Sequence, residues 1–440
     1  MLFSSISFLY YFLPCVLFLY FLVPRAWKNS VLLLFSLLFY SWGEPYYVIY
    51  MLGSIVIGYA SGRLIEKYHE NSKSKWILTA SVLLHVVVLF VFKVSPTLPI
   101  GISFYTFQVI SYMIDVYRKD TEAQKNPFDF AMYVSMFPQL IAGPIVRYVD
   151  IERQIKQRTH TIEKAAYGIR RFILGLSKKV LLANTLGELC EIFKASNDKS
   201  ILFYWMYAIA FTLHIYFDFS GYSDMAIGLG KIFGFDYLEN FNYPYISCSV
   251  TEFWRRWHIS LGSWFRDYVY IPLGGNRVKR GRHILNILVV WGLTGLWHGG
   301  AWNFVIWGLY FAVLLIVEKM WMLKHLKTSR VWSRLYTLLA VIVGFVIFNA
   351  ADVREAFLYL GAMFGAGQVP VVSLEAVYYL QSYALIFVVA IIGATPIAKR
   401  IAQRIRVSDY IEPFVLLLLL VAATSYLVDG SFNPFLYFRF

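Results

Sequence analysis

The chain has 440 residues, of which 59% are hydrophobic and only 15% are charged. An ordinary soluble domain has about a quarter of its residues charged, so this composition excludes a typical soluble enzyme and indicates a polytopic membrane protein. The formal net charge is +14, from 40 basic and 26 acidic residues. In a membrane protein such an excess is typical of cytoplasmic loops, so it does not indicate nucleic-acid binding.

Hydrophobic runs separated by basic or Pro/Gly breaks number roughly 10 to 12 by the length needed to span a bilayer. We therefore predict an all-α polytopic membrane protein, with residues 1–440 forming a single integral membrane domain. Its motif-bearing core covers residues 98–310, and C-terminal helices occupy residues 334–440. The Gly-rich motifs of ATP-driven, dinucleotide-binding and serine-hydrolase proteins are absent, and three distant cysteines predict neither a disulfide nor a metal site.

The first apolar run, MLFSSISFLYYFLPCVLFLYFLV, lacks the basic start and the small-residue cleavage site of a signal peptide, so we expect a retained span. The next run, Val31–Ala60, is long enough for a two-span hairpin that turns near Gly43–Pro45. Basic clusters at Arg25–Lys28 and Arg63–Lys75 flank this hairpin. They place both of its ends on the cytoplasmic side and the N-terminus outside.

Two further segments depart from a simple span. Within Phe128–Val146, the stretch FPQLIAGPIVR has two prolines and a glycine, which predicts a re-entrant element whose backbone is buried in protein. His85 stands alone in the run WILTASVLLHVVVLFVF. It is best interpreted as a histidine at a contact between helices.

A polar group lies in the run ILFYWMYAIAFTLHIYFDFSGYSDMAIGLG. His214 and Asp218 are four residues apart and share one helix face, and Asp224 follows after Ser220-Gly221. At membrane depth such side chains need buried partners or a watery cavity. A structural ion pair and a functional pocket both remain open, and the structural interpretation is slightly favoured.

The stretch SVTEFWRRWHISLGSWFRDYVYIPLGG begins with a helix-start signal, because Ser249 and Glu252 form the pattern S-x-x-E. Aromatic residues then recur at helical spacing as far as Tyr268, which predicts one amphipathic helix at the bilayer interface. His258 falls on its aromatic face.

Basic residues cover much of the remaining surface of this predicted helix. Arg255 and Arg256 begin a basic patch that extends to Arg282. Guanidinium groups bind phosphate well, so the patch would contact either lipid phosphates or a phosphate-bearing substrate or acidic partner.

The stretch TGLWHGG places a histidine in another apolar run. If Trp291–Trp302 is helical, one face carries Trp291, Thr294, Gly295, His298 and Trp302. Gly295 and Gly299 form a small-residue pair typical of close helix packing. Close packing alone does not require a histidine between tryptophans, whereas the wall of a tunnel for a slender apolar or thioester-bearing ligand does.

Three stretches, YFDFSGYSDMAIGLG, EFWRRWHISLGSWFRDYVYIPLGG and LTGLWHGGAWNF, together resemble the membrane-bound O-acyltransferase family. The resemblance is strongest to its bacterial polysaccharide O-acetylation branch, typified by alginate acetylation, and the tail DGSFNPFLYFRF and the segment FPQLIAGPIVRY share it. It implies a ring of about 10–12 tilted and re-entrant helices around a central funnel or tunnel. The family's membrane histidine maps onto His298 and the histidine of its W-x-x-W-H motif onto His258, which implies that both are catalytic.

The resemblance implies transfer of an acyl group, with acetyl expected, from a cytoplasmic thioester donor across the membrane to hydroxyls of an exported cell-surface polysaccharide. A neutral imidazole can take the proton of the hydroxyl, so His298 is the expected general base. His258 and Thr294 are candidates for stabilising the oxyanion. The residues expected to bind the donor or line its tunnel are Trp291, Thr294, Gly295, Trp302, Arg255 and Arg256.

The expected donor is acetyl-CoA or another acyl thioester, with no tightly bound cofactor and no metal. The expected partners are the polysaccharide, an extracytoplasmic acetyltransferase and membrane lipids, at a bacterial cytoplasmic membrane. One alternative within the family is D-alanyl transfer to teichoic acid from a carrier-protein thioester. An alternative from another class is a polysaccharide or proton-coupled transporter, in which protons would pass along His214, Asp218, Asp224 and His298.

Overall fold

The computed structural model of the protein describes residues 2–95, 97–141, 143–326, 328–405, 411–429, 433, 434 and 436. Every regular element within these residues is a helix. Seven of the described helical segments are long and apolar enough to cross a membrane: Val48–Lys67, Ser72–Val94, Ile201–Ile232, Trp302–Leu326, Arg330–Asn349, Leu374–Gly393 and Ile411–Val428. The prediction of an all-α polytopic membrane protein is confirmed, and the ring around a funnel stays a prediction.

Parts of three predicted features lie outside the described residues. These are most of the tail DGSFNPFLYFRF, Ala142 of FPQLIAGPIVRY and Arg406 of the last basic cluster. Within the tail, the structure describes Asp429, Asn433, Pro434 and Leu436.

The chain forms two compact units. The first comprises Met1–Leu176 and Tyr222–Glu239, and the second comprises Ser177–Gly221 and Asn240–Phe440. The division falls inside helix α11 (Ile201–Ile232), which continues through Ser220 and Gly221 without interruption.

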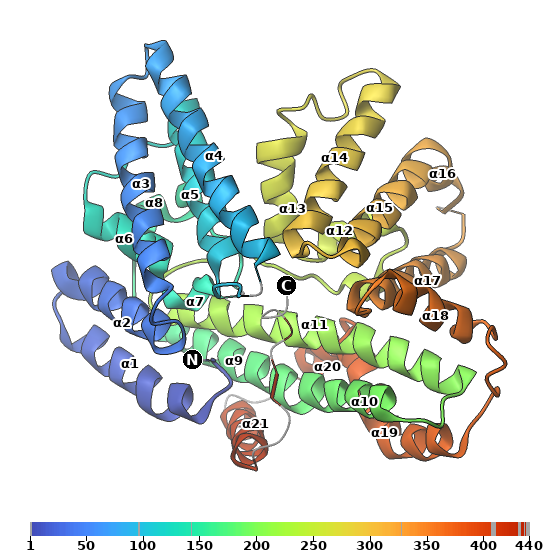
Figure 1. Ribbon diagram of the computed structural model, residues 1–440. Coiled ribbons are helices and arrows are strands. Elements are labelled where there is room, and N and C mark those ends of the chain that lie inside the picture. The colour runs from blue at the N-terminus through green and yellow to red at the C-terminus, as the bar shows by residue number, and fades with distance from the viewer. Residues whose placement is uncertain are drawn as a thin grey trace. The chain divides into compact units, whose positions relative to one another are not determined.

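The first unit contains helices from the N-terminal part of the chain, shown in blue and blue-green in Figure 1. Its elements are η1 (Phe8–Phe12), α1 (Leu13–Leu22), η2 (Arg25–Trp27), α2 (Lys28–Gly43), α3 (Val48–Lys67), α4 (Ser72–Val94), α5 (Ile102–Arg118), α6 (Pro127–Ser135), α7 (Phe137–Leu140), α8 (Tyr148–Lys156) and α9 (Ile162–Ser177), followed by the last part of α11. Because α2 ends at Gly43 and α3 begins at Val48, the predicted turn near Gly43–Pro45 is confirmed. Of these two helices only α3 is among the candidate spans, so the two-span hairpin stays a prediction.

Helices α3 and α4 lie side by side in this unit (Figure 1) and are joined by a polar contact. The His85 ring of α4 lies 2.8 Å from its own helix at Ser81 O and 3.0 Å from Ser54 Oγ of α3. Both ring nitrogens are therefore occupied, and the interpretation of His85 as a helix-contact histidine is confirmed.

The predicted interruption within Phe128–Val146 is also present. The segment forms two short helices, α6 and α7, that are separated at Met136. Pro138 lies in the first turn of α7, where the absence of its N–H costs no helical hydrogen bond. The N–H of Phe137 at the start of α7 donates to Ser36 Oγ of α2 over 3.1 Å, so this broken backbone is tied to a neighbouring helix.

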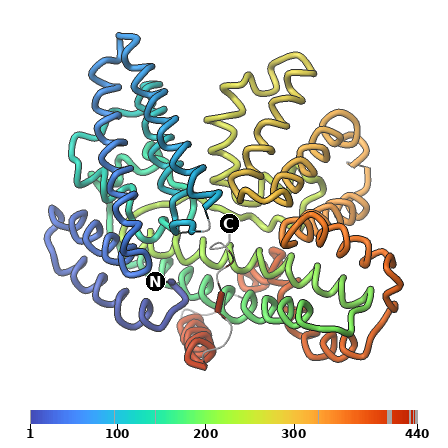
Figure 2. Tube along the Cα trace, in the orientation of Figure 1, coloured from blue at the N-terminus to red at the C-terminus, as the bar shows by residue number. Residues whose placement is uncertain are grey.

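The second unit carries the candidate site, and Figure 2 traces its chain from green to red. Its elements are η3 (Lys178–Ala183), α10 (Asn184–Ala195), the first part of α11, η4 (Pro244–Ile246), α12 (Val250–Arg256), α13 (Ile259–Phe265), η5 (Arg266–Tyr270), α14 (Arg280–His298), α15 (Trp302–Val317), η6 (Glu318–Met322), α16 (Leu323–Leu326), α17 (Arg330–Asn349), α18 (Val353–Met363), α19 (Leu374–Gly393), α20 (Ile397–Ile405) and α21 (Ile411–Val428).

Helices α14 and α15 pack against each other (Figure 2), and glycines lie at their contact. A Cβ atom at Gly295 would lie 2.5 Å from the carbonyl oxygen of Phe304, and one at Gly308 would collide with the carbonyl oxygen of Trp291. Two helix backbones can approach this closely only where no side chain intervenes, which is how small residues promote helix association in membranes. This packing fixes α14, and with it His298, against α15.

A glycine-to-alanine substitution tests this contact. We expect Gly295→Ala to lower the free energy of unfolding by about 1–3 kcal/mol, because the added methyl group meets backbone rather than a movable side chain. The matched control is Gly292→Ala on the same helix, where a Cβ meets nothing within 4 Å. Thermal unfolding of the purified protein in detergent measures both, and equal midpoints for the two variants would contradict the packing argument.

Candidate active site

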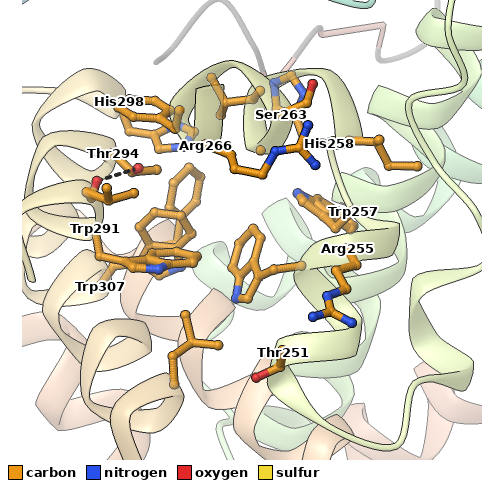
Figure 3. Close-up of a pocket in the computed structure, with 18 of the residues that line it drawn as sticks. Thr251, Arg255, Trp257, His258, Ser263, Arg266, Trp291, Thr294, His298 and Trp307 are labelled. Carbon is orange, nitrogen blue, oxygen red and sulfur yellow. Dashed lines mark hydrogen bonds between the residues drawn. The ribbon is translucent and has the colours of Figure 1, made fainter. Parts of the chain in front are cut away.

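The second unit contains a cavity of about 560 Å³ that is lined mainly by aromatic and aliphatic side chains. Figure 3 shows Trp291, Thr294, His298 and Trp307 on one side of this cavity and Trp257, His258, Ser263 and Arg255 on the other. An apolar hollow with a few convergent polar groups is typical of a small-molecule site.

His298 is the last residue of α14 and lines the cavity. Its side chain is 8% exposed and is surrounded by aromatic rings, with the ring of Trp307 at 5.1 Å and that of Phe348 at 5.0 Å, both edge-to-face. The ring of the neighbouring Trp297 lies 4.7 Å away. Aromatic packing therefore fixes the orientation of the imidazole at the cavity wall.

The predicted helix face from Trp291 to Trp302 is only partly present. Trp291 and Thr294 line the cavity together with His298, whereas Gly295 packs against α15. Trp302 is 73% exposed and begins α15, so the prediction that it continues the same face is wrong. The reason is that α14 ends at His298, where a Gly-Gly pair follows.

The segment that carries the second histidine is a broken helix. The predicted start is confirmed, because Ser249 Oγ accepts a hydrogen bond from the Glu252 N–H over 2.9 Å. The prediction of one continuous amphipathic helix is wrong, since α12 ends at Arg256 and α13 begins at Ile259. Between them His258 adopts the left-handed conformation, with φ 45° and ψ 55°, which costs a non-glycine residue about 1–2 kcal/mol.

Asn240 connects to both sides of this break. Its Oδ1 lies 3.1 Å from His258 Nδ1 and accepts hydrogen bonds from Ser260 Oγ at 2.9 Å and from the Ser260 N–H at 3.2 Å. Its backbone oxygen accepts from the Ile259 N–H at 2.9 Å. The strained turn is thus held by one asparagine, which is itself buried.

His258 lies outside the seven candidate spans and lines the cavity. Its ring packs edge-to-face against Phe219, with 4.6 Å between the ring centres. Burial lowers the pKa of His258 to about 3, because a low-dielectric environment disfavours the charged imidazolium. The ring is therefore neutral at physiological pH.

The start of α12 is anchored by Glu318 of η6. This carboxylate is fully buried and accepts hydrogen bonds from the Val250 N–H at 2.6 Å, the Thr251 N–H at 2.8 Å and Thr251 Oγ1 at 2.7 Å. A carboxylate at a helix N-terminus satisfies amide groups that have no partner within the helix. Glu318 thereby fixes the direction of the short helix that presents Arg255.

The two adjacent arginines have different surroundings. Arg256 forms an ion pair with Glu252 at 2.8 Å and donates to the carbonyl oxygen of Asn242, and it does not line the cavity. Arg255 does line the cavity, and among the residues that the structure describes it makes no ion pair. Lys319 lines the cavity as well, so this wall carries positive charge that can attract an anion.

The predicted polar cluster of α11 separates into different contacts. Asp218 lines the cavity and forms an ion pair with Lys179 at 2.7 Å, and both side chains are 1% exposed. The Leu436 N–H of the tail donates to Asp218 Oδ2 at 3.0 Å, and Lys179 donates to Asn184 Oδ1 at 2.7 Å and to the carbonyl oxygen of Pro434. A fully hydrogen-bonded pair of this kind favours the structural interpretation of Asp218.

The other two members of that cluster do not line the cavity. Asp224 belongs to the first unit, where Arg171 donates to its Oδ1 at 2.8 and 3.0 Å. His214 is buried in the second unit, with the ring of Phe211 at 6.2 Å.

Four residues of this unit were missed at the level of sequence: Lys179, Asn240, Glu318 and Lys319. Glu318 directly follows an apolar run of sixteen residues in α15. A charged residue at membrane depth needs a buried partner, as argued for Asp218, and this signal would have identified Glu318. Lys179 was hidden in the pair Lys178-Lys179, which looks like an ordinary basic break. Asn240 offers no local signal, since its side-chain partners lie 18 and 20 residues away.

The chain is similar to known membrane acyltransferases. Residues 69–358 match the family model of the membrane-bound O-acyltransferases. The chain is 39% identical to a "Probable alginate O-acetylase" of Azotobacter vinelandii, with 100% of both chains covered, and 30% identical to a peptidoglycan O-acetyltransferase of Helicobacter pylori, with 100% of this chain and 98% of that protein covered. It is 29% identical to a teichoic acid D-alanyltransferase of Bacillus subtilis over 63% of this chain and 77% of that protein.

The chain therefore belongs to the membrane-bound O-acyltransferase family. It is a multi-pass membrane enzyme that transfers an acyl group to a hydroxyl.

The ion pair between Lys179 and Asp218 can be tested by removing one charge. We expect Lys179→Met to lower the free energy of unfolding by about 3–5 kcal/mol, because it leaves a buried carboxylate without its counter-ion. Adding Asp218→Asn to this variant should recover part of the loss. Chemical denaturation in detergent measures both variants.

A matched control is Lys194→Met, which removes the partly exposed ion pair between Lys194 and Glu191. An exposed pair contributes at most about 1 kcal/mol, so this variant should stay near the wild-type stability. Equal losses of unfolding free energy in the two lysine variants would show that the buried ion pair contributes no more to stability than the control pair.

Proposed function

We propose that the protein transfers an acetyl group from a cytoplasmic acyl thioester, acetyl-CoA or a carrier-bound equivalent, to hydroxyls of an exported polysaccharide at the bacterial cytoplasmic membrane. The observation that carries this proposal is the imidazole of His298, held by aromatic rings in the wall of an apolar cavity. Acetyl as the cargo is supported by the full-length similarity to a protein named for alginate O-acetylation. The similarity to a D-alanyltransferase covers less of the chain at lower identity.

In this mechanism His298 is the general base. The hydroxyl oxygen of the acceptor attacks the thioester carbonyl carbon while the imidazole takes the hydroxyl proton. The tetrahedral oxyanion then collapses, the carbon–sulfur bond breaks, and the imidazolium returns its proton to the departing thiolate. General base catalysis of this kind contributes on the order of 10² to 10⁴ in rate.

The cationic wall suits a donor that carries phosphate. Arg255 and Lys319 both line the cavity, and neither is neutralised by a carboxylate that also lines it, because Asp218 is already paired with Lys179. A guanidinium group binds phosphate oxygens in a forked geometry, and an ammonium group attracts them as a point charge. The two residues would therefore hold the phosphates of the thioester donor.

The location of the reaction follows from where its substrates are found. A thioester donor is cytoplasmic, whereas the polysaccharide is outside, so the acetyl group must cross the bilayer while the donor stays behind. We propose that an extracytoplasmic acetyltransferase partner completes the transfer to the polymer, so the hydroxyl that attacks the thioester beside His298 belongs to an intermediate carrier or to polymer that the partner presents. The transporter alternative predicts transport without ester formation, so a measurement of acetyl ester distinguishes a transporter from an acyltransferase.

Replacing the proposed base should abolish transfer. We expect His298→Ala to reduce formation of acetyl ester by a factor on the order of 10² to 10⁴ while the protein still inserts and folds. The measurement uses membranes of the native bacterium, which supply the protein together with its partner, and adds labelled acetyl-CoA and de-acetylated polymer, with D-alanyl carrier protein as the competing donor. His325→Ala, an exposed histidine outside the cavity, is the control.

Wild-type ester levels in a folded His298→Ala variant would remove this residue from catalysis. Transfer from the D-alanyl carrier protein in place of acetyl-CoA would replace the acetyl proposal by the D-alanyl alternative.

The two neighbouring arginines provide a matched pair for testing the donor site. Arg255→Gln should raise the KM for acetyl-CoA several-fold with little change in kcat, since a phosphate contact far from the reacting carbon serves binding alone. Arg256→Gln should leave the KM near the wild-type value, because Arg256 is paired with Glu252. Equal effects of both substitutions would indicate that the basic patch contacts lipid and not the donor.

A further inference from the structure

The buried oxygen of Asn240 decides which nitrogen of His258 carries the proton. The backbone N–H of Ser260 can only donate, so the amide atom that it meets at 3.2 Å must be the oxygen of Asn240 and not its nitrogen. The same oxygen lies 3.1 Å from His258 Nδ1. An oxygen of this kind only accepts, and therefore Nδ1 must be the protonated nitrogen.

A neutral ring with its proton on Nδ1 has its lone pair on Nε2. At Nε2 such a ring accepts a hydrogen bond and cannot donate one. His258 is therefore a poor donor to an oxyanion, contrary to one of the two expectations from the sequence. The other candidate donor, Thr294, already donates its hydroxyl proton to the carbonyl oxygen of Val290 at 2.8 Å.

We infer that Asn240 is a positioning residue for acyl transfer, which holds His258 in the left-handed turn and in the one tautomer that offers Nε2 to an N–H or O–H group of a substrate. This inference rests on the proposed function. His258 makes and breaks no covalent bond in it, and the substrate keeps its proton in the hydrogen bond to Nε2.

The packing around His258 supports a role in the site. The side chain lines the same cavity as His298, and the ring of Trp297 packs near both imidazoles, 6.3 Å from the His258 ring and 4.7 Å from the His298 ring. The backbone strain at His258 persists because Asn240 bonds to each of the three residues of the turn, His258, Ile259 and Ser260. Strain that is stabilised in this way is typical of functional sites.

Three variants test the inference. Asn240→Ala removes the acceptor oxygen and should lower kcat/KM for acetyl transfer by about 10- to 100-fold, by analogy with the loss that follows when the partner orienting a metal-binding histidine is removed. Asn240→Asp keeps an acceptor in the same place and should restore most of this loss at neutral pH. Asn242→Ala changes an exposed asparagine two residues along the same loop and is the control.

The aspartate variant also gives a signature in pH. A carboxylate beside Nδ1–H favours the imidazolium and should raise the pKa of His258 by about one to three units. Below the raised pKa the ring is charged and Nε2 becomes a donor. The ratio of the Asn240→Asp rate to the wild-type rate should therefore be constant above pH of about 7 and fall between about pH 6 and 4.

Other titratable groups are common to both proteins and cancel in this ratio. Those that line the cavity with His258 are Asp218, Arg255, Arg266, Tyr270, His298 and Lys319, from α11, α12, η5, α14 and η6.

The rates are measured with labelled acetyl-CoA and polymer in membranes, varying each substrate separately. A raised KM for acetyl-CoA in Asn240→Ala assigns the N–H or O–H group to the donor, and a raised KM for the polymer assigns it to the acceptor. Full activity of Asn240→Ala, or a flat rate ratio for a folded Asn240→Asp, would overturn the inference. Failure of the proposed function is distinguishable, because wild-type membranes would then form no acetyl ester.

Discussion

A polar side chain buried in a chain this apolar is costly unless it has a partner, and this requirement of a partner shapes the site of the second unit. Removing the hydrogen bonds of a buried polar group costs about 1–3 kcal/mol, and stranding a buried charge costs more. Each polar group that positions the site meets the requirement through a partner distant in sequence. Lys179 forms an ion pair with Asp218, Glu318 accepts hydrogen bonds from the free amides at the start of α12, and Asn240 accepts hydrogen bonds from the turn at His258.

These partners connect stability to chemistry. The apolar packing of α14 against α15 places His298 at the cavity wall, and glycine is needed there because lipid gives helices little hydrophobic reason to associate. The polar contacts then place a second imidazole and a cation at the same cavity. The proposed base, hydrogen-bond acceptor and anion-binding wall can thus be held at one largely apolar cavity without an exposed loop to carry them.

The break between α12 and α13 is the clearest case of structure serving the site at a cost. A continuous helix would satisfy the backbone more simply, yet it would carry His258 in a helical conformation and away from the oxygen of Asn240. The left-handed turn instead gives the ring a single tautomer and a fixed place beside Phe219. The electrostatic surroundings keep that ring uncharged, as burial lowers its pKa to about 3.

The amino-acid sequence by itself determined the helical membrane class, the turn between α2 and α3, the interruption near Met136 and the two histidines of the cavity, because each depends on local composition or on a contiguous motif. Only the tertiary structure decided which polar residues serve the site. Arg255 and Arg256 are equivalent by composition, and only packing turned one to the cavity and the other to Glu252. Trp302 does not lie on the predicted helix face, because α14 ends at His298 before the glycine pair. Asn240 contacts His258 through a hydrogen bond that no local sequence pattern predicts. Periodicity predicts which face of its own helix a residue occupies. A hydrogen-bond partner, in contrast, depends on which distant chain segments come together in the folded protein.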